Sequence, residues 1–176
     1  RHEEEIDMPN ALRTCALTLL VSLAAQGAFA AQDDDFVEDA SAKGVAEVEA
    51  GKLAQEKGSA ADVKAFADMM IKDHTAANAK LKTIADAKNL KVSDSAELMD
   101  KAKAMILELR GAKSFDQAYA NNQVKAHEAT IEIFEKEISE GKDAEVKAFA
   151  TETLPKLKSH LEHAKTLSEA HAGDAK

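Results

Sequence analysis

Apolar residues recur at helical spacing along most of this chain. Beyond residue 35 they are separated by alternating steps of three and four residues, which is the period of a helix that buries one face. No segment alternates apolar and polar residues in the way a half-buried strand does. The pattern predicts long helices at about residues 36–57, 60–88, 114–140 and 143–172, and a shorter helix at 95–110.

Capping residues mark the ends of these predicted helices. A helix commonly starts at a serine or aspartate that is followed three residues later by an acidic or amide residue, and it commonly ends at a glycine. Pro155 lies inside the last helix and predicts a bend there. The expected starts are Asp35–Glu38, Ser59–Asp62, Asp94–Glu97, Ser114–Gln117 and Asp143, and the expected stops are Gly58, Gly111 and Gly141.

The chain contains a weak internal repeat that predicts its topology. Residues 61–67 (ADVKAFA) match residues 144–150 (AEVKAFA), so the first helix pair resembles the second. The loops inside each pair are very short and force antiparallel neighbours, whereas residues 89–113 are long enough to carry the chain back along the bundle. We therefore expect an all-α fold, a ferritin-like four-helix bundle of two antiparallel hairpins with a short helix in the long crossover.

The apolar faces contain polar residues that a hydrophobic seam does not need. His74, His127 and His160 occupy such positions on the second, third and fourth long helices, and the predicted buried face of the third also holds Val124 and Ile138. On the first helix the polar residue is Glu47, unless Val48 is the inward residue instead. Counted from the end that holds the first hairpin loop, the four positions lie about 11 to 15 residues deep. At about 1.5 Å per residue this spread is about 6 Å, so the side chains can meet.

Three imidazoles and one carboxylate form a ligand set for a single ion of zinc, copper, iron or manganese. Asp73 and Glu128, each next to a histidine in sequence, are predicted outer partners of the ligands. Without a metal, the same residues could instead form a polar network that fixes the register of the helices. The predicted metal ligands are Glu47, His74, His127 and His160.

A di-iron centre is not expected. In the ferritin-like di-iron proteins two helices each carry a Glu-x-x-His motif, but the residues three before the histidines are Ile71, Val124 and Leu157. Met70 lies one turn before His74, and a thioether can bind copper. Methionine at helical spacing more often fills gaps in a core, and we favour that interpretation.

The N-terminal part has the features of a secretory signal peptide. Residues 8–30 combine a positively charged start, a short apolar run and the small-x-small sequence Ala28-Phe29-Ala30, which predicts cleavage after Ala30. Residues 1–7 precede the methionine at the start of this segment and are interpreted as translated leader or otherwise non-native sequence. The expected mature protein is a single domain, residues 31–176, exported to the periplasm.

Charge and cysteine content limit the possible partners. The formal net charge of −9 argues against a nucleic-acid partner, which needs a basic surface, and is compatible with binding cations. The one cysteine, Cys15, lies in the predicted signal peptide, so the mature protein has no thiolate ligand. No segment reaches the ~20 apolar residues that a transmembrane helix needs.

Several segments resemble one family of exported bacterial proteins. They are FVEDA at 36–40, VKAFA at 63–67, KDHT at 72–75, His127-Glu128 and TLPKLKSH at 153–160. Their combination is similar to the family called domain of unknown function 4142, over nearly all of the expected mature chain. The resemblance implies a ferritin-like fold and export, and it supplies no established activity.

Three functions fit this pattern. We favour a periplasmic protein that binds one transition-metal ion, with an expected role in envelope stress. The second function is a metal-free bundle that is structural or binds another envelope protein. The third, favoured least, is a mononuclear redox enzyme with an open position on its metal. The sequence contains no phosphate-binding loop and no nucleophile elbow that would point to other chemistry.

Overall fold

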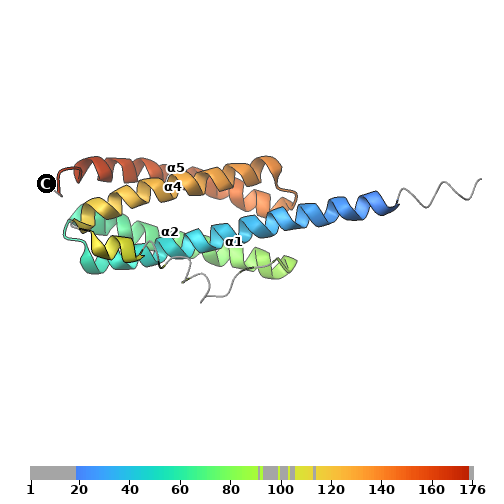
Figure 1. The fold of residues 1–176 in the computed structure, drawn as a ribbon, viewed down its shortest axis with the longest axis horizontal. Coiled ribbons are helices and arrows are strands. Elements are labelled where there is room, and N and C mark those ends of the chain that lie inside the picture. The colour runs from blue at the N-terminus through green and yellow to red at the C-terminus, as the bar shows by residue number, and fades with distance from the viewer. Residues whose placement is uncertain are drawn as a thin grey trace, which may run out of the picture.

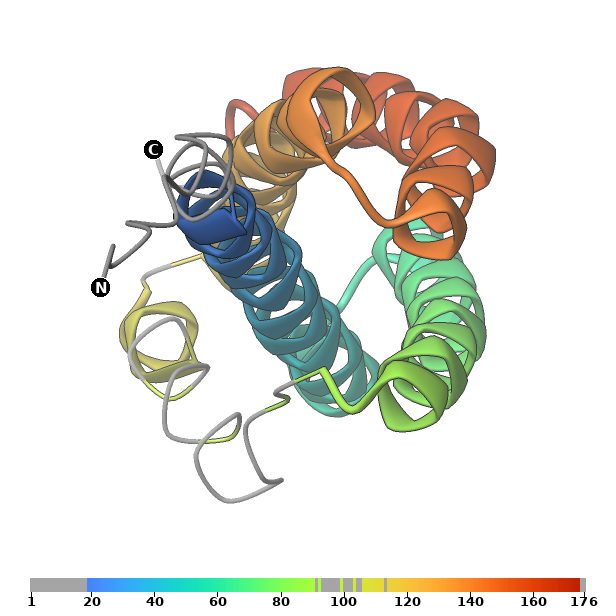
Figure 2. The same cartoon turned by 90° about the vertical axis from the view of Figure 1, so that its right-hand side faces the viewer.

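The computed structural model describes residues 19–90, 92, 99, 103, 106–112 and 114–174, with side chains from residue 33 onward. Its four long helices, α1 (Leu19–Lys57), α2 (Ala61–Lys88), α4 (Phe115–Glu140) and α5 (Ala144–Ala170), form an antiparallel bundle (Figure 1). In the ring of helices, α1 lies beside α2 and α4, and α5 lies beside α4 and α2 (Figure 2). The predicted all-α bundle of two hairpins is confirmed, and these described residues contain no strand.

Helix α1 begins earlier than predicted. It is 39 residues long and starts at Leu19 rather than near Phe36, so its first turns project beyond the bundle (Figure 1). Residues 19–32 are rich in alanine and leucine and contain no proline, so they continue a helix readily. The predicted start at Asp35 is therefore wrong for this chain. Residues 1–18, which hold the predicted leader and the start of the predicted signal peptide, lie outside the described residues.

The crossover after α2 is described in part. Asn89 ends α2 in the left-handed conformation, with φ of 54°. Most of the predicted helix at 95–110 lies outside the described residues, but residues 106–111 are helical. In this segment Leu109 is 2% exposed and packs into the core of the bundle. The described end of the crossover therefore contributes to the core.

The start of α2 is capped from another helix. The predicted capping box of Ser59 and Asp62 is wrong, because the N-cap residue is Ala60, which has no side-chain cap, and Asp62 accepts a backbone hydrogen bond from the N–H of Val63. Instead the carboxylate of Asp116, near the start of α4, accepts hydrogen bonds from the backbone N–H groups of Ser59 and Ala60 and from the Ser59 hydroxyl. A carboxylate at this place offsets unpaired N–H groups and the helix dipole. Asp116 thus ties the first hairpin to the second.

The other two long helices start as predicted. At the start of α4 the Ser114 hydroxyl accepts a hydrogen bond from the backbone N–H of Gln117. At the start of α5 the Asp143 carboxylate accepts hydrogen bonds from two N–H groups of the first turn. Helix α5 remains one helix through Pro155, so the proline does not divide it into two shorter helices.

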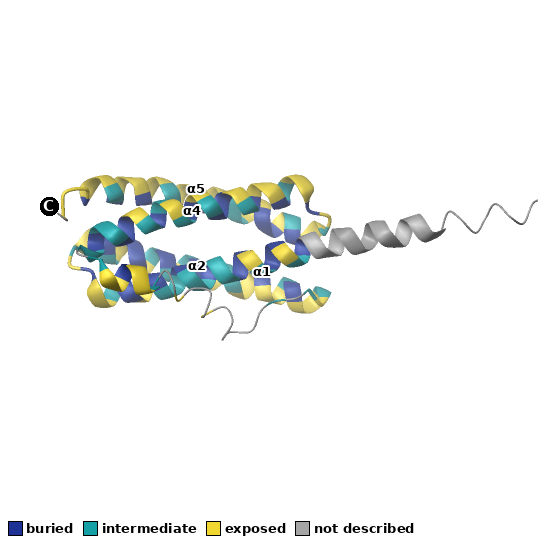
Figure 3. Ribbon diagram, in the orientation of Figure 1, coloured by how far each residue is buried: buried dark blue, intermediate teal, exposed yellow. Residues whose placement is uncertain are grey.

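The buried faces of the long helices point into the bundle (Figure 3), where the apolar core forms two clusters. One cluster lies toward the α1–α2 loop and includes Met70 and Tyr119. In the other cluster, Phe36 and Phe149 pack against Phe134 with ring centroids 5.0 and 5.9 Å away. Between these clusters lies a layer of buried polar residues, called the polar layer below, which positions the candidate site. It consists of Glu47, His74, Gln123, His127, Thr130 and His160. Within the described part of the chain, no helix has the length and hydropathy needed to cross a membrane.

Candidate metal centre

Three buried histidines face one another in the polar layer. His74 of α2, His127 of α4 and His160 of α5 are 6%, 1% and 2% exposed. The centroids of their rings are 5.6, 5.5 and 5.4 Å apart, so the rings form a nearly equilateral triangle. One ring nitrogen of each histidine lies within 4.8 Å of a ring nitrogen of both others. The similar depths expected from the sequence therefore bring these three side chains together.

Hydrogen bonds to the outer nitrogens fix two of the rings. The backbone carbonyl of Gln123 lies 2.8 Å from Nδ1 of His127, and since a carbonyl only accepts, Nδ1 donates and Nε2 of the neutral ring keeps its lone pair. The Asp73 carboxylate lies 2.9 Å from Nε2 of His160, so this nitrogen donates and Nδ1 keeps its lone pair. The remaining nitrogens, Nε2 of His74, Nε2 of His127 and Nδ1 of His160, are buried without a hydrogen-bond partner.

The surroundings of His74 and His160 favour neutral rings. Burial, together with the neighbouring His127 and His160, lowers the pKa of His74 to about 3. Burial also lowers the pKa of His160, against the opposing effect of the Asp73 carboxylate. Neutral imidazole is the form that binds a metal. At neutral pH, therefore, no proton has to leave His74 before a metal can bind.

Glu47 enters the polar layer from α1, near His127. It is 3% exposed and Val48 is only half-buried, so Glu47 is the inward residue of this turn. Its carboxylate does not belong to the group of atoms that lie within 4.8 Å of one another, so the structure brings together three of the four predicted ligands. Burial raises the pKa of Glu47, while His127, the side chain of Gln123 and Lys43 act in the opposite direction. The Oε2 atom of Glu47 has no hydrogen-bond partner.

Of the two predicted outer partners of the histidines, Asp73 contacts a histidine and Glu128 does not. Asp73 does hold a histidine, but it holds His160 on the neighbouring helix rather than its own neighbour in sequence. Glu128 is exposed, so its prediction as an outer partner is wrong, because adjacent residues on a helix point about 100° apart. Met70 is fully buried in the apolar cluster toward the α1–α2 loop, as expected for a methionine that fills the core.

A second group of ligand types lies near the α1–α2 loop. Asp116, His171 and Asp174 each place one atom within 4.8 Å of the others. Both ring nitrogens of His171 are already paired, Nδ1 with Asp174 and Nε2 with Asp62, and these hydrogen bonds raise the pKa of His171. Asp116 already caps α2. These partners make the group a structural link between the end of α5 and the start of α2.

The sequence pattern missed two polar residues on α4. Gln123 is 0% exposed and Thr130 is 5% exposed, whereas Val124 and Ile138, which the apolar pattern placed inward, are half-buried. The inward face of α4 is rotated toward its polar residues because it lines the polar layer. A signal was present in the sequence, since Gln123 and Thr130 lie four residues before and three after His127, on the same helix face.

The three histidines fit a cation better than a hydrogen-bonded network. His127 and His160 present only lone pairs to the centre, and His74 can donate to one of them at most. Each buried polar atom without a partner costs about 1–3 kcal/mol, and one cation would satisfy all three nitrogens. Nitrogen ligands about 2.0–2.1 Å from a tetrahedral ion lie about 3.3 Å apart, so each ring has to move inward by about 1 Å or less.

The fold and this site together define an all-α, ferritin-like bundle with a buried histidine cluster. The chain belongs to the family described as Domain of unknown function (DUF4142), which matches residues 19–167. The family resemblance noted from the sequence is thereby confirmed. No curated protein matches the chain in sequence.

Solved structures of CopM share this fold. CopM in the Cu(I)-bound form has a TM-score of 0.67 and 13% sequence identity, over 80% of this chain and 98% of that one. The Ag-bound form has a TM-score of 0.64 with 13% identity, over 80% and 98% of the two chains. The Cu(II)-bound form has a TM-score of 0.63 with 13% identity, over 78% and 96%. At this identity the similarity shows a shared fold.

Proposed function

We propose that this protein binds one copper ion through His74, His127 and His160, with Glu47 as the nearby carboxylate that balances the charge and moves in as fourth ligand. One observation carries the proposal. One nitrogen of each of three buried rings lies within 4.8 Å of a nitrogen of both others, and each ring has one buried nitrogen without a hydrogen-bond partner. Hydrogen bonds among the three rings alone would leave at least one of these acceptors unpaired, whereas a metal ion uses all of them.

Copper is the ion that the ligand set and the fold support best. The site offers imidazole and carboxylate and no thiolate, and for such ligands Cu(II) has the highest affinity among the divalent first-row metals, with zinc as a competitor. CopM, which shares the fold, is known in Cu(I)-, Cu(II)- and Ag-bound forms. Together with the predicted signal peptide, this supports a protein that holds copper in the periplasm, with a role in envelope stress.

Equilibrium titration with Cu(II) tests this proposal, and helix α5 offers a matched pair of variants. His160 is 2% exposed in the centre, whereas His163, three residues later on the same helix, is exposed. We expect one equivalent of copper in the wild type, bound about 100-fold more weakly or not at all in His160→Ala, because losing a ligand costs at least as much as losing an outer partner. His163→Ala should bind as the wild type does.

Bound metal is measured by elemental analysis after removal of free copper, and zinc is added in competition. Loss of copper in His163→Ala but not in His160→Ala would show that it binds at an exposed histidine rather than in the centre. A wild type that takes up neither copper nor zinc would contradict the proposal and favour the metal-free bundle.

A further inference from the structure

The histidine centre is closed to solvent, so an ion needs a path to reach it. A small cavity of about 30 Å³ borders His74 and His160 but touches neither His127 nor Glu47. Larger surface hollows of about 460 to 510 Å³ lie elsewhere, and none of them is lined by a histidine of the centre. Most of its lining residues belong to α2 and α5, and the others belong to α1 and α4, so the cavity lies beside the ring triangle and mainly between α2 and α5.

Two charged residues, Asp73 of α2 and Lys156 of α5, line this cavity. The side chain of Asp73 is 18% exposed, and its two oxygens point to different partners. Oδ2 accepts a hydrogen bond from Nε2 of buried His160 at 2.9 Å, and Oδ1 accepts one from Nζ of Lys156 at 3.2 Å. Asp73 thus connects a ring of the centre with the surface.

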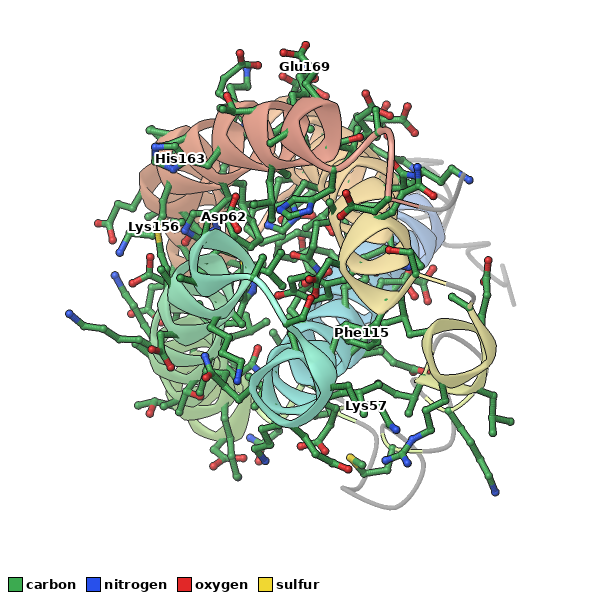
Figure 4. The ribbon with its side chains drawn as sticks, turned by 90° about the vertical axis from the view of Figure 1, so that its left-hand side faces the viewer. Lys57, Asp62, Phe115, Lys156, His163 and Glu169 are labelled. Carbon is green, nitrogen blue, oxygen red and sulfur yellow. The ribbon has the colours of Figure 1, made fainter. Side chains whose placement is uncertain are left out.

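Lys156 lies on the outer side of this carboxylate. Its side chain is 57% exposed, and it lies at the outside of the bundle between α5 and α2 (Figure 4). Of the four neighbouring helix pairs, α2 and α5 have the sparsest contact. The ion pair of Asp73 and Lys156 therefore lies over the cavity at the interface of α2 and α5, which is the sparsest of the four.

We propose that the metal ion enters between α2 and α5, with Asp73 as the carboxylate that first receives it and Lys156 as a cationic gate over that carboxylate. This inference rests on the proposed metal centre. The incoming cation displaces the ammonium group of Lys156 from Oδ1 of Asp73 and then passes to His160 and His74. The ammonium group repels a dication and competes with it for the same oxygen, so Lys156 slows loading and also slows escape.

The rate of copper loading tests the gate, and the chain supplies both a probe and a control. Tyr119 is the only tyrosine and there is no tryptophan, so quenching of tyrosine fluorescence by Cu(II) reports a buried position next to the polar layer. Lys158 is 54% exposed, lies two residues after Lys156 on α5 and pairs with Glu135, away from the cavity. Lys156→Met and Lys158→Met change the net charge equally.

In stopped-flow mixing with Cu(II) at low ionic strength, Lys156→Met is expected to load about fivefold faster than Lys158→Met, because one positive charge is removed within a few ångströms of the path. The ratio should fall as salt is added. Copper release to a chelator should also accelerate in Lys156→Met, and the stoichiometry should stay at one copper in both variants. Asp73→Asn should load more slowly than either.

Equal loading rates for the two lysine variants would overturn the gate while leaving the metal centre intact. A wild type that binds no copper at equilibrium would instead overturn the centre itself. The two failures are therefore distinguishable by the titration and the rate measurement.

Discussion

Cu(II) is expected to raise the thermal unfolding midpoint of the metal-free protein by about 8–16 °C when the free metal exceeds its dissociation constant about 1,000-fold. Binding to the folded state alone contributes about 4 kcal/mol under these conditions. For a domain of this size each kcal/mol shifts the midpoint by about 2–4 °C. Binding is confined to the folded state because the ligands come from α2, α4 and α5, which only the folded bundle brings together.

The variant His127→Leu should lose most of this shift, since it removes one ligand and leaves a side chain of similar volume in its place. His163→Ala serves as the control and should keep the full shift, because His163 is exposed on the outside of α5. Differential scanning calorimetry with and without Cu(II) makes the measurement. A shift of equal size in His127→Leu would mean that copper stabilises the fold from another site.

Acid should destabilise the metal-free protein more steeply than it destabilises His74→Leu. The pKa of His74 is about 3 in the folded state because of burial and the neighbouring histidines, and about 6.5 in the unfolded chain. The contribution of His74 is therefore complete above pH 6.5. It is lost as pH falls toward 3, because the unfolded chain takes up a proton that the folded protein does not. The slope approaches about 1.4 kcal/mol per pH unit.

Urea unfolding at several pH values between 8 and 5 checks this prediction. Over that interval the wild type should lose about 2 kcal/mol relative to His74→Leu. The comparison must be a difference between the two proteins, because buried Glu137, with a pKa raised to about 8 by burial and by Asp33, acts in the opposite direction between pH 4.5 and 8. Its effect is common to both proteins and cancels. Parallel stability curves for the two proteins would contradict the neutral, buried state of His74.

The meeting of the three histidines was predictable from the sequence because it depends on two simple quantities. The helical period assigns each histidine to the buried face, and the count of residues from the hairpin loop sets its depth. The depth tolerates an error of one or two residues, because each residue adds only about 1.5 Å. His74, His127 and His160 are buried and adjacent as a result.

The hydrogen-bond partners of the histidines depend on how each helix is rotated about its own axis. The apolar pattern determines this rotation poorly when polar residues are also buried. The pattern on α4 pointed to Val124, although Gln123 is the residue that lies in the polar layer and whose carbonyl orients His127. The pairing of Asp73 with His160 joins different helices, so no spacing within one helix reveals it. The capping of α2 by Asp116 was missed for the same reason.

The start of α1 was predicted wrongly for a different reason. The capping signals at Asp35 and Glu38 were interpreted as a helix start, but the alanine-rich segment before them continues the helix back to Leu19. A capping pattern does not mark the start of a helix when the residues before it have high helix propensity and can themselves be helical. The expected domain, residues 31–176, and cleavage after Ala30 remain predictions for the exported protein.

The position of the bound metal tests most directly whether copper binds between the three histidines. Crystals of the copper-loaded protein, measured at wavelengths on both sides of the copper absorption edge, give an anomalous difference map that locates the ion. We predict one strong peak between Nε2 of His74, Nε2 of His127 and Nδ1 of His160, with each nitrogen about 2.0 Å from the ion, as is typical for imidazole ligands. A strong peak beside His171 or at the surface, with none between the three rings, would contradict the account.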